Sequence, residues 1–309
     1  QGDIELHRPK IEAKVKRHEM LRQATMEILS RFELVIVEEA HEVSGDSFYT
    51  VMSACRNAVY RMALTATPFM KDDEAANMRL LACCGPVAIQ ISEKMLIDRG
   101  ILAKPYFKYL QLPETHKPKK LFRSTPWQPA YDAGITHNEF RNKMFCAEVL
   151  RGMRYGLNGM MLVQRKEHGE ILKAMLSKAG ARVEFIYGED NQAARDKALQ
   201  ALGRGELDVL IGSTIMDVGV DVPSLGIICL VGGGKAEVAT RQRIGRGLRE
   251  KKGGMVNAAF IVDASDDFNN HLKEHALQRR AIVMGTPGFG ENIVTDFNFD
   301  ALGLVRKAA

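Results

Sequence analysis

Two adjacent glutamates and a histidine follow a short apolar run in the first part of the chain. In the stretch FELVIVEEAHEV, residues 34–37 are apolar and run directly into Glu38 and Glu39, with His41 two residues further on. A pair of carboxylates at the end of a strand can hold a divalent cation and orient a water molecule. The alternative is that the strand leaves the core there and its charges meet water. Other polar motifs of the chain decide between these two interpretations.

A second cluster of polar residues lies in RQRIGRGLR, residues 241–249. Three arginines recur at intervals of three, which brings them close to one face of a helix: Arg243, Arg246 and Arg249. Guanidinium groups held so close repel one another unless an anion lies between them. Two glycines in the same segment cost a helix about 1 kcal/mol each, and a solvated basic face would leave that cost uncompensated. The pattern therefore favours a phosphate ligand.

Hydroxyl groups and glycine–aspartate pairs occur at the ends of two further apolar runs. Thr65 and Thr67 lie in LTATP at the end of an expected strand, where parallel sheets place their ligands. These hydroxyls alone are weak evidence, because hydroxyls commonly cap the helix or turn that follows a strand. The sequence GSTIMDVGVDVP, residues 212–223, follows another expected strand. Each motif is unspecific by itself. The order of all four along the chain is what indicates the kind of protein.

Short apolar strands alternate with helical segments on both sides of a proline-rich stretch. Residues 10–31 have helical spacing, and residues 34–37 form a fully apolar strand of the kind buried in parallel sheets. The stretch 98–132 carries five prolines and is typical of an irregular connection. After it we expect, in order, helix 137–155, strand 159–164, helix 167–179, strand 182–188, helix 191–203, strands 207–213 and 226–231, helix 236–249 and strand 257–264. The alternation predicts an α/β fold with parallel sheets.

The composition is typical of a globular protein and gives no sign of a membrane-spanning or disulfide-rich protein. A chain of 309 residues suffices for roughly two domains, and 46% hydrophobic with 26% charged residues is typical of globular proteins. No apolar run approaches the ~18 residues that a membrane helix needs. The net charge of +5 is compatible with a polyanionic partner. The five cysteines show no metal or disulfide spacing, which predicts reduced thiols in a cytoplasm.

Taken in chain order, EEAH, TAT, the glycine–aspartate element and QRIGRGLR resemble motifs II to VI of superfamily-two DEAD/DEAH-like helicases. The resemblance covers roughly residues 30–265 and is closest to phage-type and recombination ATP-dependent DNA helicases. It implies two RecA-like parallel-sheet domains, the first truncated at its N-terminus. We expect the C-terminal part of the first, ATP-binding domain at 1–98, a linker or irregular connection at 99–134, the second helicase domain at 135–285 and a tail at 286–309.

The resemblance implies a site for ATP and Mg²⁺ that is divided between the two domains. Glu39 would be the base that orients the attacking water, and Glu38 would hold Mg²⁺ through water. His41 would relay contact to Thr65 and Thr67. Motifs V and VI would supply the remaining nucleotide contacts, with the arginines acting on the γ-phosphate: Gly219, Asp221, Gln242, Arg246 and Arg249.

The same resemblance implies contacts with nucleic acid in the second domain. Ser213 or Thr214 of motif V would face a phosphate, and LVQRKEHG, which resembles motif IV, would touch nucleic acid through Gln164 or Arg165. DNA, single-stranded or branched, is expected rather than RNA, because motifs V and VI resemble those of recombination and phage enzymes. The expected location is the cytoplasm of a bacterium or of a phage-infected host cell.

Two features depart from the pattern of the family. The first carboxylate of the DEAH box is ordinarily an aspartate, whereas Glu38 is one methylene longer. No GxxxxGK[ST] phosphate loop occurs in the 309 residues, so we expect that loop upstream of Gln1 and expect the chain alone to be inactive in ATP hydrolysis. Two alternatives stay open: the motor portion of a restriction enzyme, and a non-catalytic nucleic-acid-binding module.

Overall fold

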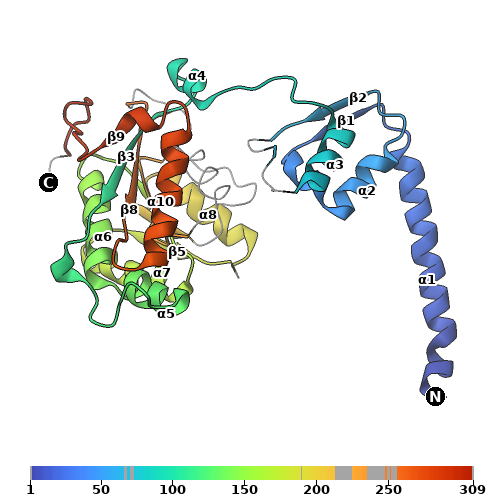
Figure 1. Ribbon diagram of the computed structural model, residues 1–309, viewed down its shortest axis with the longest axis horizontal. Helices are drawn as coiled ribbons and strands as arrows, with labels where there is room; N and C mark the ends of the chain where they lie inside the picture. The colour runs from blue at the N-terminus through green and yellow to red at the C-terminus, as the bar shows by residue number, and fades with distance from the viewer. Residues whose placement is uncertain are drawn as a thin grey trace. The chain divides into compact units, whose positions relative to one another are not determined.

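Both parts of the molecule are built on parallel strands. The computed structural model describes residues 2–65, 68–69, 73–188, 190–212, 225–234, 248, 251 and 256–307. It divides into two compact units, Gln1–Gln90 and Ile91–Ala309 (Figure 1), each of which has its own sheet. The parallel pairing in both sheets confirms the predicted α/β class. Within the described part of the chain, no helix combines the length and apolar character needed to cross a membrane.

The first unit contains two parallel strands and the helices that cover one face of them. Its elements are α1 (Gly2–Leu29), β1 (Leu34–Val37), η1 (Ala40–Ser44), α2 (Asp46–Ala54), β2 (Tyr60–Ala63) and α3 (Glu74–Cys84). β1 pairs with β2 along its whole length, from Leu34 opposite Tyr60 to Val37 opposite Ala63. One sheet face packs with η1, α2 and α3 around a small core. On the other face four side chains are more than half exposed: Leu34, Ile36, Tyr60 and Met62.

Arg61 ties β2 to both covering helices of the first unit. Its guanidinium donates to Cys55 O at 2.7 Å and to Met52 O at 3.2 Å, at the end of α2. It also donates to Cys83 O at 3.3 Å, at the end of α3. These bonds satisfy carbonyl groups that a helix end leaves without partners, and they fix both helices against the strand.

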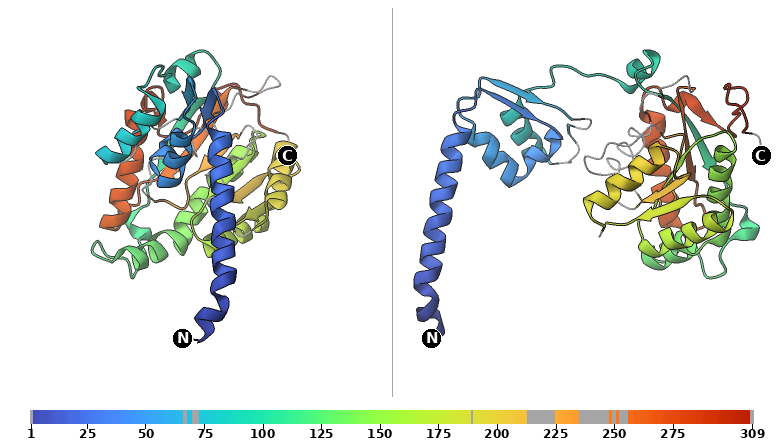
Figure 2. Two further views of the ribbon diagram at one scale, coloured as in Figure 1. Left: turned by 90° about the vertical axis from the view of Figure 1, so that its right-hand side faces the viewer. Right: turned by 180° about the vertical axis from the view of Figure 1, so that it is seen from behind.

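The second unit is a seven-stranded parallel sheet with helices on both faces (Figure 1, Figure 2). The strand order is β5-β6-β4-β7-β8-β3-β9. The strands are β3 (Lys104–Leu110), β4 (Gly159–Leu162), β5 (Val183–Ile186), β6 (Val209–Gly212), β7 (Ile227–Cys229), β8 (Ala258–Ala264) and β9 (Ile293–Val294). The helices are α4 (Glu93–Asp98), η2 (Glu114–His116), α5 (Trp127–Tyr131), η3 (Asp132–Thr136), α6 (Glu139–Met153), α7 (Lys166–Lys178), α8 (Gln192–Gly203), α10 (Asn270–Gly285) and η5 (Gly290–Asn292).

Successive residues of β4 show how the sheet separates two cores. Met160 and Leu162 pack in the core that α8 and α10 cover. Met161 points the other way, into the core that α6 and α7 cover. Alternation of this kind explains why β4, β6 and β7 are apolar at every position, since both of their faces are buried.

The structure differs from the expected boundaries in three segments. Residues 104–110 of the proline-rich stretch form β3, which pairs with β8 on one side and β9 on the other. Pro105 and two lysines make this strand look irregular, but it is stabilised by its neighbours in the sheet. The expected tail also belongs to the second unit, because it contains β9 and the buried Phe297 and Phe299. Helix α4, expected in the first domain, lies in the second unit as well.

Candidate functional site

The EEAH residues form a tight turn at the carboxyl end of β1. Leu64 N donates to Val37 O at 2.8 Å and Ala40 N donates to Leu64 O at 3.0 Å, so the turn is bonded to the residue that leaves β2. Glu39 has φ 49° and ψ 48°, a left-handed conformation that costs a residue other than glycine about 1–3 kcal/mol. The buried Ala40 holds this conformation in place, while both glutamate side chains are exposed.

His41 joins this turn to the end of β2. Its side chain is only 10% exposed, and its Nδ1 lies 3.0 Å from Thr65 Oγ1 and 3.5 Å from Glu39 Oε2. The other ring nitrogen, Nε2, lies 3.5 Å from Glu42 Oε1. The structure therefore brings together three residues that the sequence singled out, namely Glu39, His41 and Thr65.

The two adjacent carboxylates fit a hard divalent cation. Within the described residues Glu38 has no ion-pair or hydrogen-bond partner, and Glu39 contacts His41 alone. Their oxygens lie at the carboxyl ends of parallel strands, where sheets of this kind place ligands. Mg²⁺ takes oxygen ligands and retains several of its waters, so an exposed carboxylate at Glu38 suits contact through water.

In the second unit, Gln164 and Arg165 follow the carboxyl end of β4. The exposed Gln164 donates from Nε2 to Gly233 O at 3.1 Å. Arg165 donates from Nη1 to Asp132 Oδ1 at 3.0 Å, and its guanidinium carbon lies 4.5 Å from the centre of the Tyr131 ring. Both side chains of the motif that resembles motif IV are thus tied to neighbouring segments.

The other predicted site residues lie outside the described residues: Thr67, Ser213, Thr214, Gly219, Asp221, Gln242, Arg246 and Arg249. The described residues next to them show where the chain enters and leaves these segments. Strand β6 ends at Gly212, one residue before Ser213. Leu248, next to Arg249, is only 1% exposed, and its carbonyl accepts a hydrogen bond from Ala103 N at 2.6 Å.

A buried ion-pair network in the second unit was not predicted from the sequence. Arg141 on α6 donates to both carboxylate oxygens of Asp266, at 2.7 and 3.1 Å. Arg279 on α10 donates to both oxygens of Asp263, at 2.8 Å each. All four residues are at most 4% exposed. The sequence shows charged residues in a helix and after a strand, and this signal does not reveal which of them are paired.

His168 on α7 is buried against α6. It is 0% exposed, and its Nε2 lies 2.9 Å from Asn142 Oδ1. Because Asn142 uses its amide group to donate to Thr136 O, its oxygen accepts from the histidine ring. Burial, aided by the charge of Arg141, lowers the pKa of His168 to about 3. The ring is therefore a neutral hydrogen-bond donor that joins the two helices.

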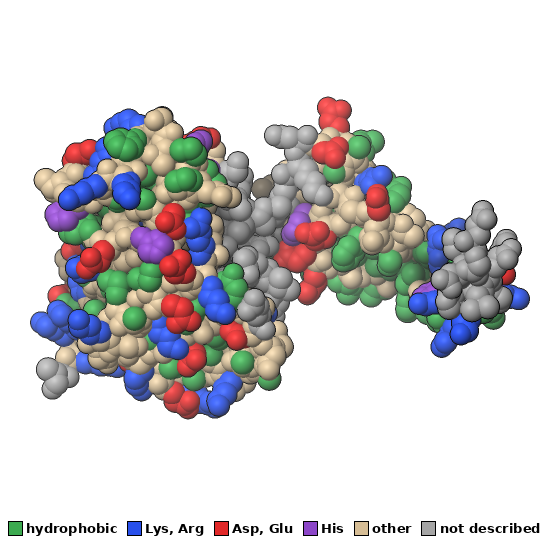
Figure 3. All heavy atoms as spheres, turned by 90° about the horizontal axis from the view of Figure 1, so that it is seen from below, with side chains coloured by type: hydrophobic (Ala, Val, Ile, Leu, Met, Phe, Trp, Pro, Cys, Tyr) green, Lys and Arg blue, Asp and Glu red, His purple; other side chains and the backbone are tan. Residues whose placement is uncertain are grey.

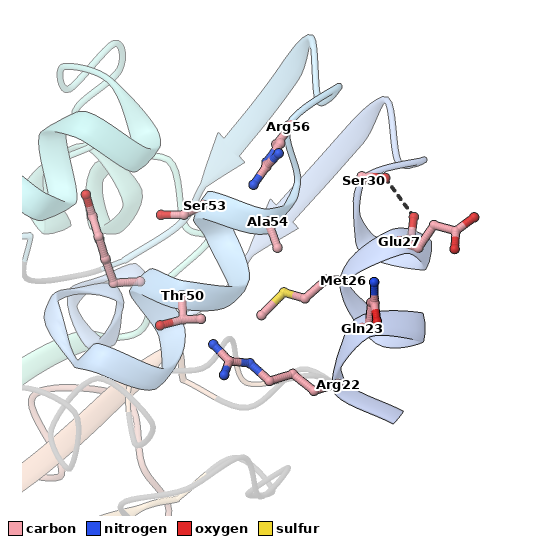
Figure 4. Close-up of a pocket in the computed structure, with 10 residues that line it drawn as sticks. Arg22, Gln23, Met26, Glu27, Ser30, Thr50, Ser53, Ala54 and Arg56 are labelled. Carbon is pink, nitrogen blue, oxygen red and sulfur yellow. Dashed lines mark hydrogen bonds between the residues drawn. The ribbon is translucent and has the colours of Figure 1, made fainter. Parts of the chain in front are cut away.

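The first unit also has a cleft of about 670 Å³ between α1 and α2. Figure 4 shows the side chains of Arg22 and Arg56 directed into it, with Met26 and Thr50 nearby. Guanidinium and hydroxyl groups donate hydrogen bonds, so the cleft offers donors to a solute. None of the residues that line it belongs to the EEAH turn, so the cleft is separate from the carboxylate site.

Comparison with known sequences finds proteins that are similar to this chain. Residues 142–251 match the helicase conserved C-terminal domain. Putative helicase 22 of a Sulfolobus islandicus filamentous virus is 23% identical, over 81% of this chain and 46% of that protein. The DNA 3'-5' translocase XPB2 of Sulfurisphaera tokodaii is 26% identical (78% and 61%), and the ATP-dependent DNA helicase uvsW of phage T4 is 21% identical (78% and 47%). The chain thus spans about half the length of these relatives.

Two solved structures share the fold. A fragment of a putative HsdR subunit of a type I restriction enzyme from Vibrio vulnificus superposes with a TM-score of 0.57 at 18% identity, over 76% of this chain and 44% of that one. Dbp5 of S. cerevisiae, bound to RNA and ADP BeF3, superposes with a TM-score of 0.51 at 14% identity, over 88% and 62%. These likenesses show a RecA-like α/β fold, and residues 142–251 are similar to the helicase conserved C-terminal domain.

Proposed function

We propose that the chain is part of an ATP-dependent DNA helicase or translocase, which couples ATP hydrolysis between two RecA-like domains to movement on nucleic acid. The unit Gln1–Gln90 belongs to the first, ATP-binding domain, and the unit Ile91–Ala309 contains the second. The observation that carries this proposal is the EEAH turn, where His41 contacts both Glu39 and Thr65 at the ends of neighbouring strands. The match to the helicase C-terminal domain supports it from the other unit.

In this proposal the first unit positions the attacking water. Phosphoryl transfer leaves little covalent chemistry to the protein, whose task is to orient groups and balance charge. Glu39 orients the water and accepts its proton, while Glu38 would hold Mg²⁺. Bound Mg²⁺ would neutralise charge on the phosphate groups of ATP. The left-handed backbone of Glu39 fixes the direction of its side chain relative to β1.

His41 would connect hydrolysis to motion. The carboxylate of Glu39 and the hydroxyl of Thr65 both face its Nδ1, so a change at either group alters the contact with the other. Thr67, two residues beyond Thr65, is proposed to take part in the same relay. A partly buried ring with two polar neighbours has few alternative positions, and this suits it to transmit a small displacement.

The second domain would complete the site only when the two domains close on ATP. Arg246 and Arg249 are proposed to neutralise the γ-phosphate, as arginine fingers do. Gln242, Gly219 and Asp221 are proposed as further contacts with the nucleotide. Dividing the site in this way makes hydrolysis dependent on closure of the two domains. Closure in turn moves the contacts of each domain along the nucleic-acid strand.

The nucleic acid would lie along the second domain at Ser213, Thr214, Gln164 and Arg165. DNA is the proposed partner because XPB2 and uvsW are named as a DNA translocase and a DNA helicase. Basic and acidic side chains are interspersed on the face of the second unit shown in Figure 3. Among the residues described on that face, the basic side chains form no continuous patch.

The test compares two glutamates on opposite sides of His41. In the full-length protein, Glu39→Gln should leave ATP binding intact and lower DNA-stimulated hydrolysis by about 10²–10⁴-fold, the usual contribution of a general base. Glu42→Gln is the matched control, because Glu42 lies 3.5 Å from the other ring nitrogen and is exposed. Phosphate release is measured with and without single-stranded DNA. Equal rates in the two variants would remove the catalytic role from the EEAH turn.

Two other functions compete with this one. The motor portion of a restriction enzyme is favoured by the likeness in fold to the HsdR fragment. A non-catalytic nucleic-acid-binding module is favoured by a chain in which no GxxxxGK[ST] sequence occurs among the 309 residues. Cleavage of DNA by the full-length protein and its partner subunits would support the first. Failure of the full-length protein to bind an ATP analogue would support the second.

A further inference from the structure

Four successive carbonyl groups after β7 are held by four side chains from different parts of the second unit. We name residues 231–234 the glycine loop. Its acceptors and donors are Val231 O with Arg141 Nη1 at 2.7 Å, Gly232 O with Tyr131 Oη at 2.7 Å, Gly233 O with Gln164 Nε2 at 3.1 Å, and Gly234 O with Arg279 Nη1 at 2.8 Å. Residues 231–233 are buried, so their carbonyl groups need partners within the protein, and this set of bonds fixes the loop.

The backbone of the glycine loop packs closely against Val163 and Gln164. A Cβ atom at Gly232 would lie 2.9 Å from Gln164 N and 3.0 Å from backbone atoms of Val163. Gly233 and Gly234 have φ of 60° and 93°, which only glycine adopts readily. A Cβ atom at Gly234 would meet the Gln164 side-chain amide. The loop therefore requires glycine both for its conformation and for its close contact with the end of β4.

One of the four donors differs from the others in its exposure. Arg141, Tyr131 and Arg279 are at most 3% exposed, and the two arginines are fixed by buried carboxylates. Gln164 is exposed and follows the carboxyl end of β4. Among these donors it is the one that a ligand in solvent can reach. Its Nε2 carries two hydrogens, so it can donate to Gly233 O and to a second acceptor together.

The glycine loop leads directly into residues 235–249, which carry Gln242, Arg246 and Arg249. The chain is held again at the buried Leu248, whose carbonyl accepts from Ala103 N at 2.6 Å. The described residues on the two sides of Gln242 and Arg246 are thus bonded to β4, through Gly232 N and Leu162 O, and to Ala103, the residue before β3. A shift of the glycine loop would alter the point from which that segment starts.

We propose that Gln164 is a positioning residue that couples nucleic-acid binding to ATP hydrolysis through its hydrogen bond with Gly233. This inference rests on the proposed function and names the contact that regulates it. A phosphate oxygen bound by the free amide hydrogen of Gln164 orders its side chain and strengthens the bond to the glycine loop. Binding that orders one group lowers the entropic cost of the next step, which is a source of positive coupling.

The first test separates affinity from turnover in the full-length protein. Gln164→Leu keeps the size of the side chain and removes both amide hydrogens. It should lower kcat at saturating single-stranded DNA about tenfold, the effect of one net hydrogen bond, while the affinity for DNA falls about threefold or less. Gln164→Lys, which keeps a donor of similar reach, should restore most of kcat. Gln200→Leu, on the exposed end of α8, is the matched control and should match the wild type.

The second test needs no activity. Gly232 N donates to Leu162 O at 2.7 Å and Gly233 N donates to Leu230 O at 3.4 Å, so exchange of these two amide hydrogens reports on the glycine loop itself. Gln164→Leu should speed their exchange about three- to tenfold without ligand. If the wild-type protein shows no DNA-stimulated hydrolysis, the proposed function is wrong, whereas the exchange measurement still tests the bond between Gln164 and the glycine loop. Unchanged exchange, or a Gln164→Leu variant that loses affinity and kcat in equal proportion, would overturn the inference.

Discussion

Replacing Arg141 by methionine should destabilise the second unit more than any exposed arginine could. The Arg141 guanidinium makes three hydrogen bonds, two to Asp266 at 2.7 and 3.1 Å and one to Val231 O at 2.7 Å. Its side chain is 0% exposed and that of Asp266 is 2% exposed. Methionine fills most of the volume of the arginine stem but makes none of these bonds. The perturbation is therefore the loss of one partner from a buried ion pair.

The expected loss of stability depends on which cationic neighbour Asp266 keeps after Arg141 is removed. Its remaining cationic neighbour, Arg279 Nη2, lies 3.8 Å away and is bonded to Asp263. Removing one partner of a buried pair costs about 3–5 kcal/mol, out of roughly 5–15 kcal/mol for a typical domain. Adding Asp266→Asn removes the uncompensated charge and should recover about 1–3 kcal/mol. Asparagine tolerates the left-handed backbone at this position, where φ is 47°.

The assay uses the single tryptophan of the chain. Trp127 lies in the second unit beside Tyr131 and His275, with ring centres 5.3 and 4.4 Å apart, so its fluorescence follows the unfolding of that unit in urea. Arg182→Met is the control, because Arg182 makes a comparable pair with Asp208 at the surface, where water screens the pair and its loss should cost far less stability. Equal costs for the two variants, or a double variant as unstable as the sum of its singles, would refute the reasoning.

Two further predictions concern single groups. Burial lowers the pKa of His168 from 6.5 to about 3. Between these two pH values the unfolded chain binds a proton that the folded chain does not. The free energy of unfolding therefore decreases as the pH falls, by up to about 1.4 kcal/mol per pH unit. His168→Gln should flatten the urea-derived stability curve between about pH 6 and about pH 4, and curves parallel to the wild type would contradict this. In the full-length protein, Glu38→Asp should keep hydrolysis whereas Glu38→Ala should raise the Mg²⁺ concentration needed for half-maximal single-turnover rates. Two equally inactive Glu38 variants would argue against a metal contact through water.

The regular elements could be predicted because each carries its own apolar pattern. The helix expected at 191–203 is observed as α8 (Gln192–Gly203), and the helix expected at 167–179 is observed as α7 (Lys166–Lys178). Both need a buried stripe against the sheet, and that need fixes the spacing of their apolar residues. The EEAH turn could be placed for a related reason, since the apolar run that becomes β1 must end where its charges begin.

Strand β3 could not be predicted because its stability comes from residues far along the chain. Lys104 lies opposite Ala258 in β8, and Phe107 lies opposite Ile293 in β9. Neither neighbour can be inferred from residues 104–110, whose proline and lysines oppose a strand assignment when read alone. In the structure Lys108 is satisfied by Glu148 and Asp296, both at 2.7 Å, so its charge does not prevent the strand from entering the sheet.

Residues that touch a ligand can be predicted from local sequence, like the regular elements. Residues that fix those residues in place cannot, because their partners lie far along the chain. A catalytic motif leaves a trace in the sequence, because specific side chains must recur at fixed spacing. The bonds that hold the glycine loop leave none: Arg141 lies 90 residues from Val231 and 125 from Asp266, and the acceptor it meets on the loop is a backbone carbonyl, which every residue has. Arg141 therefore looks like a surface charge on an ordinary helix until the fold is known. Buried positions of this kind are where substitutions should change turnover without touching nucleotide or nucleic acid. Gln164, which we propose to contact nucleic acid, is the one donor to the glycine loop that solvent can reach.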